Sequence, residues 1–586
     1  MARHKKRRTN EIRQVRERLL WLAAIGINIL VLAGLVCLLR PAFETNDDTA
    51  LLTLVNGAKI SSDPHMVISG MLLGRILMAL YGITRALPWY TLVQYAMLFL
   101  SFTGMTRVML QRLGMLWGSV LSFLMVIWFG YESYIVIQFS RTAGIASASA
   151  MLLLFFVVSE YRHKFHFGSF LLALVLAVLA SSMRFTQFLP CAVLTTGIGL
   201  WMLIDIFSPA DVKKEYLYSR YNHKKPGILR SLAGLFIPFI LVAGVCFALR
   251  IEDKLAYQND PVWKQFRDFD VLREELYDYG FPDYPTNVET YREAGISDAG
   301  YTLYRNWNFA DPDRFTPEVM QKLIDVKEPR HFGKAVIKAF ILEVPLKLLQ
   351  KPIVWYLLFL LLAFLAGGCR GRNILCLLWG ILLFGVLYLY LFYNGRYLRT
   401  RVDTGLIYAL CLSVMWFIRP AGVKRTWFLV PVMAAVLLFV PAVKQNYPFR
   451  FKASVVKKER KLEKRRAEFE QLSKDDDHLY VMKMGALIAH DCYGPFDIMP
   501  EKVIGNVLYL GGWAAYSRAF QDTMAAYGIS NPYRDLIGNE KLYLVDNDIE
   551  LTMTYLKENY DADASYEAVG EFGKYTIYKI LSRKEA

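Results

Sequence analysis

The chain has 586 residues, of which 55% are hydrophobic and 14% aromatic, and its formal net charge is +16. A water-soluble protein could not hide so much apolar surface, and the apolar residues form blocks near the ~20 residues that cross a bilayer as a helix. The positive charge lies largely in short loops between these blocks, where lysine and arginine set membrane topology. Composition and charge therefore predict a membrane protein that does not bind nucleic acid.

The chain begins with a basic segment, residues 1–18, which is followed by the apolar block 19–39. This start resembles a signal sequence, but no small-x-small cleavage site follows the block. We interpret it as an uncleaved anchor whose basic end lies in the cytoplasm. The loop that begins at residue 40 would then face the outside.

The next apolar block, 66–87, is long enough to cross the membrane but contains Arg75 and Arg85. Because a charge at the bilayer centre costs a few kcal/mol, an interfacial or re-entrant helix is the better interpretation. If this block does not cross, every short basic loop except the one near Arg399 falls on the cytoplasmic side. About eleven crossings follow, with the N-terminus inside and the C-terminus outside. The predicted spans are 19–39, 90–106, 115–131, 144–159, 168–182, 187–206, 231–249, 353–368, 374–393, 404–418 and 427–443.

These spans divide the chain into five parts and predict a polytopic α-helical membrane protein with extracytoplasmic domains. The parts are a cytoplasmic basic tail (1–18), an N-terminal transmembrane module (19–249) with a first outer loop (40–89), an extracytoplasmic loop domain (250–350), a C-terminal transmembrane module (351–443) and an extracytoplasmic α/β domain (444–586).

Local patterns predict the structure of the two large polar parts. Thr316–Pro317 is a good helix start. In the C-terminal part, "HLYVM", "NVLYLGG" and "KLYLVDN" predict buried strands, "DIELTMTYLKENY" predicts a helix, and "YEAVGEFGKYTIYKIL" predicts a hairpin. This alternation of strands and helices is typical of a small α/β domain.

An acidic stretch, "ETNDD" at residues 44–48, follows the first span directly. One interpretation is that Asp47 or Asp48 simply caps the next helix. The other is that a carboxylate at the mouth of a cavity between helices takes a proton from a hydroxyl nucleophile.

This layout resembles the GT-C class of integral-membrane glycosyltransferases, in particular the bacterial branch of mannosyl- and aminoarabinosyl-transferase-like enzymes. Members of that class place a catalytic Asp or Glu in the first outer loop, which also carries helices lying along the membrane, and they use a sugar carried on a polyprenyl phosphate or diphosphate. Here "ETNDD" matches the acidic loop and 66–87 matches the interfacial helix. The resemblance implies a transferase that acts on a lipid-linked sugar and an envelope glycan or protein acceptor, without a further cofactor.

The resemblance also implies roles for individual acidic residues. Asp47 or Asp48 would be the general base, and the sequence does not decide between them. Glu132 in "GYESY" matches a second acidic position at the outer end of the third span, although it could equally be a solvated interfacial residue. No Asp-x-Asp or Cys/His set on the outer side predicts a metal site.

Arginines at the outer membrane edge are candidates for binding the carrier phosphate. Arg396, Arg399 and Arg401 lie in "YNGRYLRTR", against the topology rule, and guanidinium groups bind phosphate bidentately. The alternative is ordinary contact with lipid headgroups. Arg184 in "SSMRF" is a weaker candidate of the same kind.

Tyr284, Tyr301 and Trp307 could stack on an acceptor sugar, but aromatic residues buried in a small domain would show the same pattern. His65 is a lone histidine, which is more often structural than catalytic. Two other functions stay open: a transporter or flippase of lipid-linked glycans, although no internal repeat is visible, and a non-enzymatic envelope-assembly protein.

Overall fold

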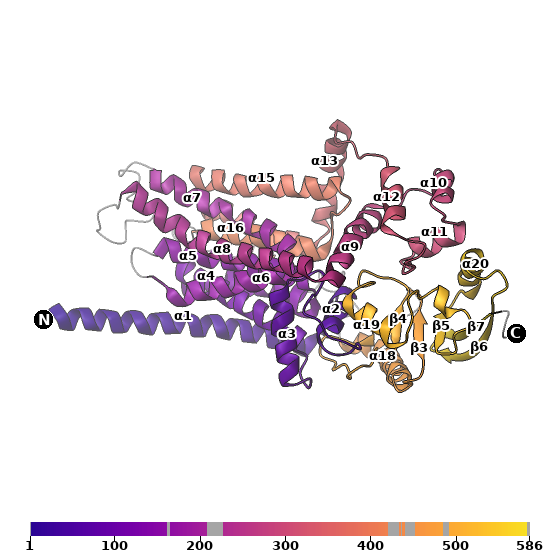
Figure 1. Ribbon diagram of the computed structural model, residues 1–586. Coiled ribbons are helices and arrows are strands. Elements are labelled where there is room, and N and C mark those ends of the chain that lie inside the picture. The colour runs from indigo at the N-terminus through magenta and orange to yellow at the C-terminus, as the bar shows by residue number, and fades with distance from the viewer. Residues whose placement is uncertain are drawn as a thin grey trace. The chain divides into compact units, whose positions relative to one another are not determined.

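The computed structural model describes residues 2–160, 165–207, 227–367, 369–419, 433–434, 436–439, 452–484 and 492–582. The chain forms two compact units, and each is assembled from segments that are distant in sequence. We call them the helical unit (Met1–Glu44, Tyr90–Arg250 and Phe332–Val456) and the mixed unit (Thr45–Trp89, Ile251–His331 and Lys457–Ala586). Figure 1 shows the long helices of the first and the sheet with short helices of the second.

The helical unit contains helices that could cross a membrane. By length and composition the described residues hold six, or up to seven if the bent pair α13 (Lys334–Leu349) and α14 (Pro352–Gly367) forms one span. The six are Gln14–Leu38, Trp89–Ile135, Phe139–Glu160, Phe167–Phe207, Ile228–Asn259 and Gly371–Tyr393. The predicted class, a polytopic helical membrane protein, is confirmed.

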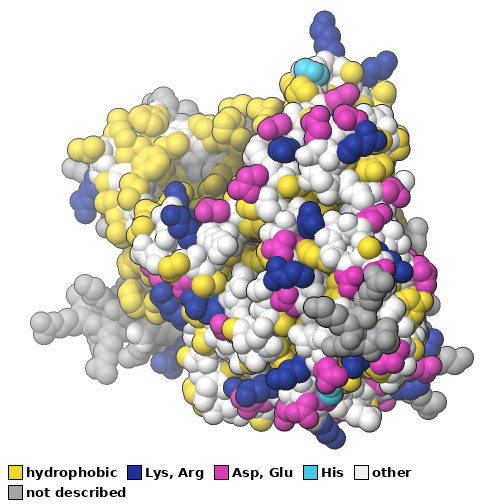
Figure 2. Space-filling model, turned by 45° about the vertical axis from the view of Figure 1, so that its right-hand side comes forward, with side chains coloured by type: hydrophobic (Ala, Val, Ile, Leu, Met, Phe, Trp, Pro, Cys, Tyr) yellow, Lys and Arg dark blue, Asp and Glu magenta, His cyan; other side chains and the backbone are white. Residues whose placement is uncertain are grey.

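Hydrophobic side chains cover much of this unit's surface. In α8 (Ile228–Asn259), Ile240 and Leu241 are 64% and 57% exposed, and α13 and α15 (Gly371–Tyr393) carry similar residues. Figure 2 shows a broad area of hydrophobic side chains, while acidic and basic side chains mix over other parts of the same view. Large exposed apolar surface of this kind is expected where a protein meets lipid.

The number of candidate spans is lower than the predicted number of crossings, about eleven. One reason is that some long helices contain two of the predicted blocks. α4 (Trp89–Gly130) and the turn that follows it contain both 90–106 and 115–131, separated by the non-helical backbone of Gly114 (φ 82°, ψ 169°). Similarly, the stretch Phe167–Phe207 includes the blocks 168–182 and 187–206.

If the bent pair of α13 and α14, which contains the block 353–368, is counted as a seventh span, two further blocks account for the rest of the difference. Block 404–418 lies in α16 (Thr400–Phe417), which is helical but is not among the candidate spans. Block 427–443 lies largely outside the described residues. The number of crossings and the orientation of both termini stay predictions.

α5 (Phe139–Glu160) is the central helix of this unit. Every residue from Phe139 to Ala150 is buried, and most are small, which lets α6 (Phe167–Leu194) and α16 pack closely against it. At the tightest point, a Cβ atom on Gly405 of α16 would lie 3.0 Å from the Cα atom of Gly144. The charged site described below begins at the first turn of α5.

The mixed unit is built on a five-stranded sheet with the order β4-β3-β5-β7-β6. β3 (Leu479–Met482), β4 (Val507–Tyr509) and β5 (Leu542–Asp546) are parallel, while β6 (Ser565–Phe572) and β7 (Tyr575–Leu581) form an antiparallel hairpin. The first three strands were predicted as buried apolar runs, and the last two were predicted as a hairpin. The predicted helix after β5 is α20 (Ile549–Asn559), and α18 (Lys452–Leu472) and α19 (Arg518–Ala526) complete the C-terminal part.

Residues 251–331 share the core of this sheet and do not form a separate domain. Their helices are α9 (Pro261–Tyr279), α10 (Val288–Glu293), α11 (Asp298–Arg305) and α12 (Pro317–Asp325). Leu303, Tyr304 and Phe309 belong to the same hydrophobic cluster as Leu479 and Leu544 of the central strands. The division into domains at 250–350 and 444–586 therefore differs from the observed one, because hydropathy separates segments but does not reveal which of them share a core.

The first loop completes the mixed unit with α2 (Asp47–Val55) and α3 (Met71–Ile83). The backbone carbonyls of Gly57 and Ala58 accept hydrogen bonds from Lys502 (2.8 Å) and Ile504 (2.9 Å). α3 has 13 residues, fewer than the ~20 that span a bilayer. This agrees with the prediction that the block 66–87 does not cross.

Candidate functional site

A buried cluster of opposite charges lies in the helical unit around Arg141. The Arg141 side chain is fully buried, and its Nη2 atom lies 2.8 Å from Oε2 of Glu44 and 3.5 Å from Oε2 of Glu132. Its Nη1 atom donates to the backbone carbonyls of Glu132 and Val136. The Glu132 side chain is 5% exposed and the Glu44 side chain is 22% exposed, so Glu44 is the most accessible member of the cluster.

Irregular backbone brings these residues together. After α4 the chain forms a π-helix, Tyr131–Ile135, followed by β2 (Val136–Ile137), which pairs in parallel with β1 (Ala42–Phe43). This short pairing places Glu44, whose N–H donates to the carbonyl of Ile137 (2.9 Å), beside the start of α5. π-helical turns are rare and occur frequently at functional sites.

A second charged group adjoins the first through α16. Nε of Arg141 donates to Oγ1 of Thr404 (3.3 Å), and the neighbouring Asp403 is fully buried. Asp403 accepts hydrogen bonds from Lys351 and from the hydroxyl of Tyr388 (2.7 Å). Ionisable side chains within membrane-type helices are costly and usually serve substrate or ion chemistry.

The predicted arginines surround the turn between α15 and α16. Arg399 is exposed and precedes the first residue of α16, while Arg396 and Arg401 are partly buried. Lys351 donates to the carbonyl of Leu398 in this turn (2.9 Å), which links the turn to the Asp403 group.

Arg184 lies elsewhere in the helical unit, at a break in α6. Its backbone there is extended (φ −159°, ψ 92°), and its guanidinium carbon lies 5.6 Å from the ring centroid of Phe139, the first residue of α5. Its role in phosphate binding stays a prediction.

Asp47 and Asp48 occupy the first turn of α2, in the mixed unit. Asp48 is fully buried, and Asp47 accepts a hydrogen bond from the Thr45 hydroxyl (3.3 Å). Carboxylates at a helix N-terminus are stabilised by the helix dipole, which gives this position a structural reason for an acidic residue. Their role as general base stays a prediction.

The three predicted acceptor-binding aromatic residues pack in the mixed unit. Tyr301 is 9% exposed and stacks on Tyr284, with 4.9 Å between ring centroids. The ring centroid of Trp307 lies 4.4 Å from that of Tyr277, and Trp307 packs against the same core. Packing accounts for all three side chains, and acceptor binding stays a prediction.

His65 lies in an aromatic and acidic cluster of the mixed unit. Its ring stacks on Trp263 (4.6 Å between centroids, 21°), and its Nδ1 atom lies 2.5 Å from Oδ1 of Asp63. Burial alone would raise the pKa of Asp63, but hydrogen bonds from His65 and Trp263 lower the pKa below its ordinary value. Because Arg518 Nε also lies 3.1 Å from Asp63, the cluster ties together all three segments of the unit, as a structural histidine would.

Sequence reasoning missed Arg141, Lys351 and Asp403. The available signal was a charge inside or beside an apolar block, as in "QFSRTAGIASASA" for Arg141 and "YLRTRVD" for Asp403. Across the part of the chain that the structure describes, no group of three or more His, Cys, Asp or Glu residues could hold a metal ion.

No protein-family model matches the chain, and no curated protein matches it. Among solved structures, the chain is similar to the crystal structure of ArnT from Cupriavidus metallidurans bound to undecaprenyl phosphate. The two are 10% identical, with a TM-score of 0.36, and the similarity covers 95% of this chain and 97% of that one. The function proposed below therefore rests on the residues of this chain.

Proposed function

We propose that the chain is a membrane glycosyltransferase that moves a sugar from a polyprenyl phosphate or diphosphate carrier to an envelope acceptor, at the outer face of the cytoplasmic membrane. The observation that carries this proposal is the cluster of Glu44, Arg141 and Glu132, buried among membrane-type helices. Glu44 follows the first predicted span, where the GT-C layout requires a carboxylate. A buried arginine pairs with it, while part of the Glu44 side chain stays accessible.

The reaction needs a proton acceptor and a group that stabilises phosphate. A bond forms between the acceptor oxygen and the anomeric carbon as the bond from that carbon to the phosphate oxygen breaks. The acceptor's proton passes to a carboxylate, and the carrier leaves as a phosphate anion. Stabilising that anion is the main electrostatic contribution of the protein.

The carboxylate has more than one candidate. The resemblance favours Asp47 or Asp48, whereas the buried ion pair with Arg141 favours Glu44. Glu44 can also orient the acceptor hydroxyl, so its replacement reports on the site under either assignment.

For the phosphate, Arg399 is the best-placed candidate because its side chain is exposed at the turn between α15 and α16. The turn is held from within: Lys351 donates to the carbonyl of Leu398, and the Leu398 N–H donates to the hydroxyl of Tyr388 (3.2 Å). A fixed turn removes the cost of ordering the backbone when phosphate binds, so only the arginine side chain has to be ordered.

The test is reconstitution of the purified chain with a panel of polyprenyl-linked sugars and measurement of transfer. Replacing the true general base by its amide should lower turnover by about 10²–10⁴-fold while leaving the protein folded. Asp47→Asn, Asp48→Asn and Glu44→Gln are compared with Glu343→Gln, a matched change at an exposed glutamate of α13. Full activity in the first three variants would refute a carboxylate base in the first loop.

The phosphate assignment is tested in the same system. Arg399→Ala should weaken binding of the carrier lipid, and Arg399→Lys should restore it only in part, because an ammonium group lacks the bidentate geometry. Arg230→Ala, at an exposed arginine near the start of α8, is the control. If the wild type transfers no sugar but moves lipid-linked sugar across the bilayer, the flippase alternative replaces the proposal.

A further inference from the structure

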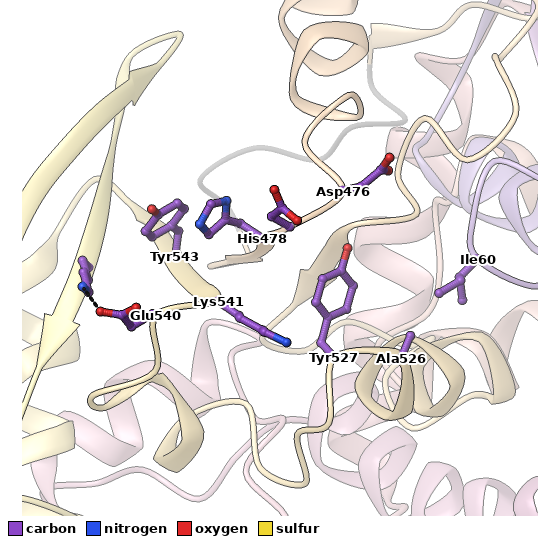
Figure 3. Close-up of a pocket in the computed structure, with 10 residues that line it drawn as sticks. Ile60, Asp476, His478, Ala526, Tyr527, Glu540, Lys541 and Tyr543 are labelled. Carbon is purple, nitrogen blue, oxygen red and sulfur yellow. Dashed lines mark hydrogen bonds and ion pairs between the residues drawn. The ribbon is translucent and has the colours of Figure 1, made fainter.

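A wide pocket of about 570 Å³ opens on the mixed unit, and none of the residues proposed above lines it. Its lining comes from the start of β3, the end of α19, the residues around β5 and the first loop. Figure 3 shows Tyr527 and Lys541 on one side, His478 and Tyr543 on the facing side, and Asp476 and Ile60 toward the other end. The volume suits a short oligomer of polar units, not an ion or a single small group.

One wall of the pocket is a rigid aromatic surface. The rings of His478 and Tyr543 stack with 4.5 Å between centroids and 19° between planes. His478 is held from behind, because its Nδ1 atom lies 2.9 Å from Oδ2 of Asp475, which also accepts a hydrogen bond from Tyr480 (2.7 Å). A flat face fixed in advance can pack against the C–H face of a ligand ring with little loss of side-chain entropy.

The end of the pocket that contains Asp476 is acidic. Asp476 and Asp477 are exposed, and within the described part of the chain no hydrogen bond or ion pair occupies their carboxylates. Tyr527 faces this group: burial, followed by the charges of the nearby aspartates, raises the pKa of its hydroxyl, which stays a hydrogen-bond donor at neutral pH. Two lysines partly balance the charge, but one of them, Lys579, is already paired with Glu540 (3.3 Å).

We propose that this pocket binds a short glycan that carries free amino groups. A sugar ring offers an apolar C–H face for the His478–Tyr543 surface and hydroxyls for Tyr527 and Lys541, and an ammonium substituent would complete the unused carboxylates of Asp476 and Asp477. The acidic wall disfavours an anionic glycan, although the chain as a whole carries a net charge of +16. Binding here requires no sugar transfer and is independent of the function proposed above.

The probe is a β-1,4-linked glucosamine tetrasaccharide, whose affinity for the full chain in nanodiscs is measured by calorimetry at about 0.15 M salt. The fully N-acetylated tetrasaccharide should bind at least about tenfold more weakly than the glucosamine probe, because it lacks the ammonium groups. Tetragalacturonate, which also lacks them, should not bind. Equal affinity for all three sugars would overturn the proposal. The proposal would also be overturned if tetralysine bound as tightly as the glucosamine probe, which would identify a polycation site. Failure of the glucosamine probe to bind would overturn it as well.

Variants then locate the site. Asp476→Asn combined with Asp477→Asn should weaken the glucosamine probe at least about tenfold while changing the acetylated sugar little, and Tyr543→Ala should weaken both sugars. Glu558→Gln, at an exposed carboxylate of α20, is the matched control and should change neither. Since Asp476 and Asp477 are exposed, their amides should leave the near-UV circular dichroism unchanged. Unchanged affinity in both the aspartate and the tyrosine variants would overturn the proposal.

Discussion

Replacing Asp311 by alanine should destabilise the mixed unit more than almost any other single change. The Asp311 side chain is fully buried and accepts hydrogen bonds from the hydroxyls of Tyr555 (2.6 Å) and Tyr560 (2.7 Å) and from Nδ2 of Asn531 (2.9 Å). Burial, and then the charges of Tyr304 and Asp311, raise the pKa of Tyr555, so its hydroxyl stays a donor. The carboxylate thus joins the segment 251–331 to the C-terminal segment of the same unit.

The size of the effect follows from the donors that would be left without an acceptor. Each hydrogen bond to a charged group contributes about 1.5–3 kcal/mol, so loss of the two tyrosine bonds alone predicts about 3–6 kcal/mol. For a unit of this size, about 2–4 °C per kcal/mol predicts a fall in Tm of roughly 6–24 °C. Asp311→Asn keeps one acceptor oxygen, so it should lower the free energy of unfolding by about half as much as Asp311→Ala.

The assay is thermal unfolding of the full chain in nanodiscs, with hydrogen exchange as a second readout. Asp325→Ala is the control, because Asp325 is exposed and accepts only a local hydrogen bond from Gln321 (2.7 Å), and it should change stability by about 0.5 kcal/mol or less. Amides of α11 and α20 should lose protection together in Asp311→Ala. Loss of protection in α11 alone, or a Tm no lower than that of Asp325→Ala, would refute the claim of one shared core.

Three further changes test other parts of the structure. Burial lowers the pKa of Lys59 to about 8, whereas in the unfolded chain the Lys59 amine stays protonated up to about pH 10.4. Between these values the unfolded state binds one more proton, so the stability of the mixed unit should rise with pH. Lys59→Met should flatten that rise in unfolding curves measured over a pH series. Gly405→Ala should cost about 1–3 kcal/mol in unfolding assays because its Cβ would lie 2.9–3.0 Å from neighbouring atoms, whereas Gly385→Ala, with open space, should cost nothing. Arg141→Met leaves Glu132 buried without its ion pair and should cost about 3–5 kcal/mol, part of which Glu132→Gln in the same chain should restore; no recovery would contradict the pairing.

Local sequence signals predicted the elements of the mixed unit well. The strands β3 and β5 are short apolar runs between polar turns, and each is buried as predicted. Thr316 caps α12 by accepting a hydrogen bond from the Val319 N–H (3.4 Å), as the Thr-Pro pair indicated. These features depend on residues that are neighbours in sequence, which is why a single sequence reveals them.

The joining of distant segments has no such signal. Trp307 has a left-handed backbone (φ 68°), and its carbonyl approaches Gly511 so closely that a Cβ atom there would lie only 1.8 Å away. Gly511 lies in the stretch "NVLYLGG", which predicted only a strand, although it is the position that lets residues 306–311 cover the end of β4. A burial pattern shows that a face is covered but does not identify the segment that covers it.

The candidate site was predictable in part for the same reason. The acidic stretch after the first span and Glu132 stood out by composition and position, and the structure places Glu132 beside Arg141. The arginine itself was hidden, because a single charge at the start of a small-residue helix is an ordinary feature of a helix end. Only the pairing of β1 with β2 brings Glu44 to it, and a pairing of two residues leaves no recognisable pattern.

Asp311 and Glu44 are held in different ways, and the difference bears on function. Asp311 is enclosed by hydroxyl, amide and backbone donors and has no exposed surface, so a ligand could reach it only by breaking the core. Glu44 is held by the fully buried Arg141 on one side and is still 22% exposed on the other. Holding a charge in place while leaving part of it accessible is costly for stability and useful for chemistry, since it orients the group before substrate arrives. That asymmetry, more than burial itself, is why the cluster around Arg141 is the place to look for catalysis in this chain.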